Sequence, residues 1–114
     1  MNEQFKNEPD FEGEKRRHLE EIEETIMSLE RDLQDIMAYI TEIELKIEES
    51  EKEKKYLEKF SEDEDKEFST KIIKDTDEFI KGCLKMKEDA FKLKESIEVA
   101  IDKAKKIKAD FESL

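Results

Sequence analysis

The stretch LEEIEETIMSLERDLQDIMAYITEIELKI, residues 19–47, decides the fold. Its large aliphatic residues recur at alternating steps of three and four positions. They are Leu19, Ile22, Ile26, Leu29, Leu33, Ile36, Ile40, Ile43 and Ile47. This spacing is the heptad repeat of a coiled coil, in which two positions of every seven, termed a and d, face a neighbouring helix. With Leu19 at a and Ile22 at d, the stretch predicts a long helix with one apolar face.

A second heptad repeat occupies the other half of the chain. Its members are Ile72, Thr76, Phe79, Cys83, Met86, Ala90, Leu93, Ile97, Ala100, Ala104, Ile107, Phe111 and Leu114. Ile72 takes position d and Thr76 takes position a. Continuing the first repeat past Leu57 would instead place d at Lys71. The two repeats are therefore out of phase, which favours two helices over one continuous helix.

An acidic segment separates the two repeats. Ser61 and Glu64 have the spacing of a helix-capping box, and acidic side chains stabilise the start of a helix. We therefore expect a first helix over about 14–60, a turn over about 61–65 and a second helix over about 66–113. Residues 1–12 are expected to form a flexible polar tail, so that the helical domain covers 13–114.

The numbering of the two repeats predicts how they pair. In an antiparallel pair each a position faces a d position, so the numbers of facing residues add up to a constant. From Leu19 with Ile107 to Ile47 with Phe79, this number is 126 for every pair, and its midpoint lies in the acidic segment. The predicted fold is an all-α, long antiparallel two-helix coiled-coil hairpin. A parallel oligomer of unbroken helices is the alternative, because isoleucine at both a and d favours three or four parallel strands.

The composition agrees with long helices. Of 114 residues, 49% are charged, and only two are glycine and one is proline. The net charge of −12 repels nucleic-acid backbones and anionic membranes, so we expect neither as a partner. The sequence contains no membrane-spanning stretch, no apolar signal segment and only one cysteine, and these features predict a cytoplasmic protein.

The sequence offers little for catalysis. His18 at a g position reads as a solvated residue, and Cys83 at an a position reads as a small buried one. No cysteine or histidine cluster has metal-ligand spacing, and no glycine-rich loop could cradle a phosphate. We therefore expect no catalytic residue, no cofactor and no metal, and a protein that is not an enzyme.

The acidic tip is a second candidate site. It consists of Glu62, Asp63, Glu64 and Asp65. These carboxylates could attract a basic protein or a divalent cation, although the segment lacks the glycine and the spacing of a calcium-binding loop. The alternative is a turn that merely stays soluble.

Apolar residues also occur beside the predicted a/d faces, at positions e and b. They are Met27, Met37, Ile73, Ile80, Leu84, Phe91 and Ile101. Such a stripe widens the apolar face beyond a two-stranded seam. We expect it to pack against a second hairpin, giving a four-helix bundle, or against a helix of a partner protein. The alternative is that neighbouring side chains of the same chain cover these residues.

These observations predict a non-enzymatic coiled-coil scaffold, adaptor or small regulatory subunit that acts through helix-to-helix contacts. Its partner would be a protein, either another copy of the chain or a different one. The alternative function is an acidic inhibitor or chaperone that covers a basic or apolar surface of another protein. Strong salt sensitivity of binding would favour this alternative, because salt screens charge contacts and not apolar ones.

Overall fold

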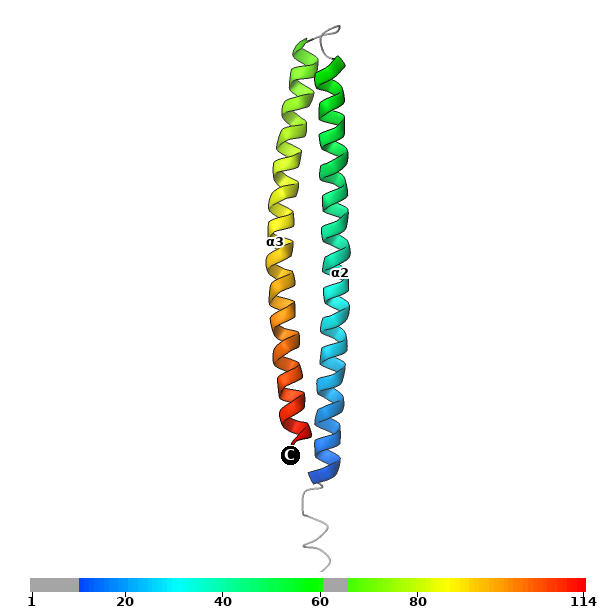
Figure 1. Ribbon diagram of the computed structural model, residues 1–114, viewed down its shortest axis with the longest axis vertical. Coiled ribbons are helices and arrows are strands. Elements are labelled where there is room, and N and C mark those ends of the chain that lie inside the picture. Colours follow the sequence, from blue (N-terminus) through cyan, green and yellow to red (C-terminus); the bar gives the residue numbers. More distant parts are fainter. Residues whose placement is uncertain (1–10, 61–65) are drawn as a thin grey trace, which may run out of the picture. The chain divides into compact units, whose positions relative to one another are not determined.

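The computed structural model describes residues 11–60 and 66–114, and these residues form two long helices. Helix α2 spans Phe11–Phe60 and helix α3 spans Lys66–Glu112 (Figure 1). No strand occurs within these two ranges, so the predicted all-α class is confirmed. Helix α2 begins at Phe11, slightly before the predicted start, because nothing between Phe11 and Gly13 interrupts helical hydrogen bonding. The predicted turn with its acidic tip, and residues 1–10 of the predicted tail, lie outside the described residues.

Local chemistry supports both helices. Glu12 and Glu14 lie in the first turn of α2 and Lys59 lies in its last turn, where each charge opposes the helix dipole. Three threonine hydroxyls donate to the carbonyl four residues earlier, at 2.8 to 3.1 Å. These are Thr25, Thr41 and Thr76. Their polar groups are therefore satisfied within their own helix.

The chain forms two units, and each contains a stretch of both helices. The terminal unit consists of Met1–Leu33 and Ser96–Leu114, and the turn-side unit consists of Gln34–Glu95. Within each unit the stretch of α2 lies alongside the stretch of α3 (Figure 1). Both units therefore have the same two-helix construction and are described separately.

Ion pairs establish the direction of the helices. In the terminal unit, Lys108 Nζ lies 3.4 Å from Glu23 Oε1. In the turn-side unit, Lys87 Nζ lies 3.7 Å from Glu44 Oε1 and Lys54 Nζ lies 2.7 Å from Asp77 Oδ1. The residue numbers of every pair add up to 131, as they do when two helices run antiparallel. The predicted helical hairpin is confirmed, and the alternative of unbroken parallel helices is wrong.

Helix α2 uses the predicted face. All nine aliphatic residues of its heptad repeat between Leu19 and Ile47 are buried or half-buried. In the turn-side unit, Ile43 and Ile47 form a buried cluster with Cys83 of α3, and Ile80 packs against this cluster. Ile43 and Cys83 are a facing pair in the predicted register. The a/d seam of α2 was therefore predictable in full.

Helix α3 uses a different face from the predicted one. Its a positions are buried or half-buried, as expected. Its second inward row is e, and this row consists of Ile73, Ile80, Lys87, Lys94, Ile101 and Lys108. Of the predicted d row, Ile72 and Ala100 are half-buried. Four residues predicted at d are between 46% and 52% exposed, namely Phe79, Met86, Leu93 and Ile107. The prediction of an a/d seam on α3 is wrong for these four residues.

The rotation of α3 has a physical cause in the e row. Exchanging d for e turns the inward face of a helix by roughly 50°, given about 100° per residue. This turn places Lys87 and Lys108 beside Glu44 and Glu23 of α2, where they form ion pairs. The aliphatic stems of the lysines cover the core while their ammonium groups reach the solvent. It also buries Ile101, which is 6% exposed.

Candidate functional site

The rotation of α3 leaves a row of large apolar side chains at the surface of the turn-side unit. We refer to Phe79, Met86 and Leu93 as the outer row. They are seven residues apart, so they lie along one face of α3. Each is about half exposed. In the terminal unit, Ile107 holds the same heptad position and is similarly exposed.

Part of the outer row lines a shallow groove between the two helices. Met86 and Leu93 form the groove with Ile36, Tyr39, Asp89 and Ala90, and its volume is about 270 Å³. The groove has depth because Ala90 is small and buried, so no large side chain fills the space above it. Asp89 is the single charged residue among those that line it.

Exposed carboxylates lie on both helices along the face that carries the groove and the outer row. On α2, Asp35 lies four residues before Tyr39 and Glu42 three residues after it, so both share a surface with Tyr39. Glu49 and Glu53 repeat the positions of Glu42 and Tyr39 further along the helix. On α3, the acids of this surface are Asp75 and Asp89, which hold the same heptad position. We refer to these six acids as the acidic border.

The acidic border is not neutralised within the chain. No ion pair joins any of the six carboxylates to a lysine or arginine of the described residues. Tyr39, Lys46 and Glu53 hold the same heptad position of α2. Lys46 is the one cation among these three residues. On the other side of the hairpin, Glu44 pairs with Lys87. The groove side therefore keeps an unbalanced negative charge.

The stripe predicted from positions e and b is not a single surface. Ile101 is buried, and Ile73 and Ile80 are half-buried against α2. Met27, Met37, Leu84 and Phe91 are exposed. The stripe thus divides into residues that belong to the hairpin core and residues that remain at the surface.

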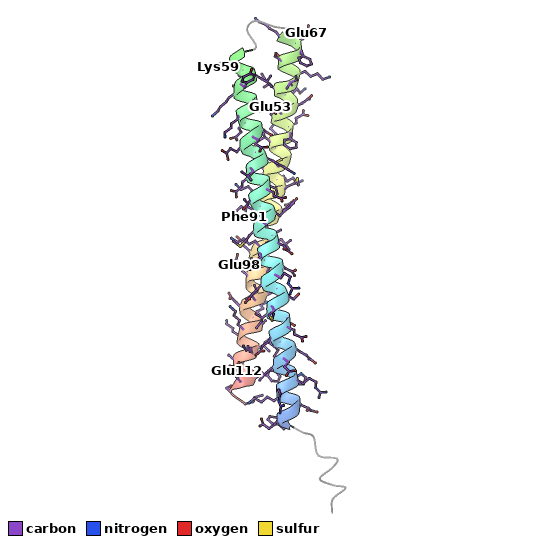
Figure 2. The ribbon with its side chains drawn as sticks, turned by 90° about the vertical axis from the view of Figure 1, so that its right-hand side faces the viewer. Glu53, Lys59, Glu67, Phe91, Glu98 and Glu112 are labelled. Carbon is purple, nitrogen blue, oxygen red and sulfur yellow. The ribbon has the colours of Figure 1, made fainter. Side chains whose placement is uncertain are left out.

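Phe91, the least exposed of these four surface residues, already has neighbours within the chain. The centroid of its ring, on the helix stretch where Figure 2 labels Phe91, lies 6.0 Å from Lys87 Nζ and 5.7 Å from Lys94 Nζ. Such cation–π contacts are favourable at a surface. Lys87 also pairs with Glu44 at 3.7 Å. Phe91 therefore takes part in a network of charged neighbours, whereas Leu84 on the same side of the turn-side unit remains half exposed.

The histidine and the cysteine lie on different helices, as predicted, and in different units. The ring of His18 is 5.7 Å from that of Phe111, and its Nδ1 is 3.7 Å from Glu21 Oε2. Cys83 is a free, buried thiol of the turn-side core. Among the residues that the structure describes, no three histidine, cysteine, aspartate or glutamate side chains gather where they could hold a metal ion. The acidic tip lies outside these residues.

No helix of the described ranges 11–60 and 66–114 has the length and apolar character that crossing a bilayer requires. The chain matches no model of a protein family, and comparisons with curated proteins and with solved structures likewise give no match.

Proposed function

We propose that this protein is a non-enzymatic coiled-coil interaction protein that binds a helix of another polypeptide along its outer row. It would act as a scaffold, an adaptor or a small regulatory subunit. The observation that carries the proposal is the half-exposed row of Phe79, Met86 and Leu93 beside the groove. A heptad-spaced row is the pattern into which the apolar face of another helix packs.

The energetics of the outer row support docking. Fully burying a Phe, Met or Leu side chain contributes roughly 1.5–3 kcal/mol. Half of each outer-row side chain is still exposed, so covering all three would contribute on the order of 3 kcal/mol. The groove adds contacts to Ile36 and Ala90, and a docked helix would approach both helices at once.

The thin core of the hairpin gives a second line of support. Only seven apolar residues are buried among those described, and none of these side chains is fully buried. A two-helix layer has no second layer to cover its faces, whereas domains bury apolar faces between packed layers. A helix on the outer row would supply such a layer.

A specific observation also favours the alternative function. The acidic border places six carboxylates, none in an ion pair within the described residues, along the face that carries the groove and the outer row, and Asp89 lines the groove itself. An inhibitor or chaperone that covers a basic surface of another protein would need such a combination. The two functions use the same face and differ in whether charge or apolar burial dominates the affinity.

The chain provides a matched pair of leucines to test the proposal. Leu93 and Leu45 are both 52% exposed, but Leu93 lies on the groove and Leu45 on the outer surface of α2. A photo-crosslinking residue at position 93 should form an adduct with a helical partner, and the same residue at position 45 should not. Leu93→Glu should abolish that assembly as measured by light scattering, while Leu45→Glu should leave it intact.

Equal crosslinking from both positions would contradict the proposal. So would an unchanged mass and unchanged partner binding after Leu93→Glu.

A further inference from the structure

We infer that the groove takes a cationic amphipathic helix, with bulky apolar residues on one face and lysines or arginines flanking that face on both sides. This inference rests on the proposed function and adds the chemistry of the partner. It follows from the combination of an apolar groove with an acidic border, which neither a neutral nor an anionic helix would match.

The geometry of the border argues for cations on both sides of the docking face. On the α2 side, Asp35, Glu42 and Glu49 repeat every seven residues, as the flanking positions of a docked helix do. On the α3 side, Asp89 lines the groove itself and Asp75 precedes Phe79 by one turn. A helix lying between these two rows brings both of its flanks against carboxylates.

The border carboxylates form no ion pair within the described residues, so they can bind the cations of another molecule. Across the seam, the chain pairs Glu44 with Lys87 and Glu23 with Lys108. The six border carboxylates make no such pair within the described residues. Carboxylates gathered at a low-dielectric apolar wall raise the local concentration of cationic ligands and speed their association.

The outer row of a second copy fits the groove poorly. This row of α3 is flanked by its own Asp75 and Asp89. Docking it into the groove of another copy would place these acids against the acidic border. Lys85 and Lys92 lie four residues before and three residues after Asp89, so they offset only the part of this repulsion that arises at Asp89.

Two designed peptides test the inference on the full-length protein. Both are three-heptad helices with the same leucines at a and d, and one carries lysine at e and g where the other carries glutamate. The lysine peptide should bind and gain helicity, and the glutamate peptide should bind at least about tenfold more weakly, because its carboxylates repel the acidic border. Binding of the lysine peptide should weaken as salt is added.

Matched charge reversals separate the groove from the general negative charge of the protein. The pair Glu42→Lys and Glu49→Lys alters the border, whereas Glu48→Lys and Glu51→Lys makes the same charge change on another surface of α2. The border pair should weaken lysine-peptide binding roughly tenfold, and the control pair should change it several-fold less. Circular dichroism checks that both variants remain helical.

The outcomes distinguish this inference from the proposed function. Equal binding of both peptides, or equal effects of both reversal pairs, would overturn the cationic partner and leave helix docking on the outer row intact. A stable dimer that binds neither peptide and dissociates on Leu93→Glu would identify the occupant as a second copy instead. Unchanged peptide binding after Leu93→Glu would overturn both proposals.

Discussion

Helices α2 and α3 differ in the number of apolar rows that they carry. Helix α2 has two, at a and d, and both are used against α3. Its exposed apolar residues, such as Met27 and Leu45, hold unrelated heptad positions. Helix α3 has apolar residues at a, d and e, although half of its e row is lysine, and the a and e rows face α2. Helix α3 therefore keeps a row of exposed apolar residues beside its contact with α2, and α2 does not.

The charges of the helices differ in the same sense. Helix α2 has 16 acidic and nine basic residues, whereas α3 has 11 acidic and 12 basic residues. Opposite charges across the seam account for the ion pairs of Glu23 with Lys108 and of Glu44 with Lys87. The excess acidic side chains of α2 remain exposed to solvent. The hairpin is held by the a and d rows of α2 and by the a and e rows of α3, and the residues outside these rows determine its surface chemistry.

The largest expected effect is at the centre of the turn-side core. Ile43 is 3% exposed, so Ile43→Asp would bury a carboxylate among Ile47 and Cys83. We expect a loss of about 3–5 kcal/mol in the free energy of unfolding, measured by urea denaturation. Leu45→Asp, on the exposed surface of the same helix, should cost less than about 0.5 kcal/mol. Similar losses for the two variants would show that the helices do not pack at Ile43.

The next effect tests the rotation of α3 directly. Ile101 at e is buried and Ile107 at d is about half exposed. Ile101→Ala should therefore lower the free energy of unfolding by about 2–3 kcal/mol, and Ile107→Ala by less than about 1 kcal/mol. Thermal denaturation of the two variants provides the comparison. A larger loss for Ile107→Ala than for Ile101→Ala would indicate that α3 packs through its a and d positions.

A smaller effect of opposite sign is expected at Gly82 in the middle of α3. A Cβ atom added at Gly82 would meet no other atom within 4 Å. Gly82→Ala should therefore stabilise the protein by up to about 1 kcal/mol, because glycine is costly inside a helix. The melting temperature measures the change. A lower melting temperature would mean that the hairpin requires glycine at position 82.

The smallest effect concerns the ion pair between Lys54 and Asp77. The hydrogen bond to Asp77 raises the pKa of Lys54 above its ordinary value. The contribution of this contact is therefore fully present below the pKa of an unfolded lysine, and it is lost as the pH rises through the folded-state pKa. Asp77→Asn should lower the pKa of Lys54, as followed by NMR titration of its side chain. An unchanged pKa would place the cause elsewhere.

The fold could be predicted from the sequence because α2 offers only one choice of seam. Leu19 to Ile47 alternate without a competing row, so the helix, its inward face and the antiparallel partner all follow. The rotation of α3 could not be predicted from periodicity alone, because a/d and a/e are both heptad seams. The ion pairs of Lys87 and Lys108 favour the second seam, and they involve residues far apart in the chain.

The candidate site depended on that rotation and was therefore missed. While Phe79, Met86 and Leu93 were assigned to the core, only the e/b residues appeared to be left for a partner. One signal in the sequence could have indicated which face of α3 packs against α2. Lysines at three e positions of α3 lie opposite Glu23, Met37 and Glu44 of α2, which marks the e row as a partly charged inner edge.

The buried thiol of Cys83 can report how often the two helices of the turn-side unit separate. Cys83 is the only cysteine of the chain, and its thiol lies between the helices of the turn-side unit. A thiol reagent can reach it only when α2 and α3 separate there, so the labelling rate reports how often this unit opens. A helix bound in the groove would have to dissociate before α2 and α3 separate. It would therefore slow the labelling of Cys83 in proportion to the time that it stays bound.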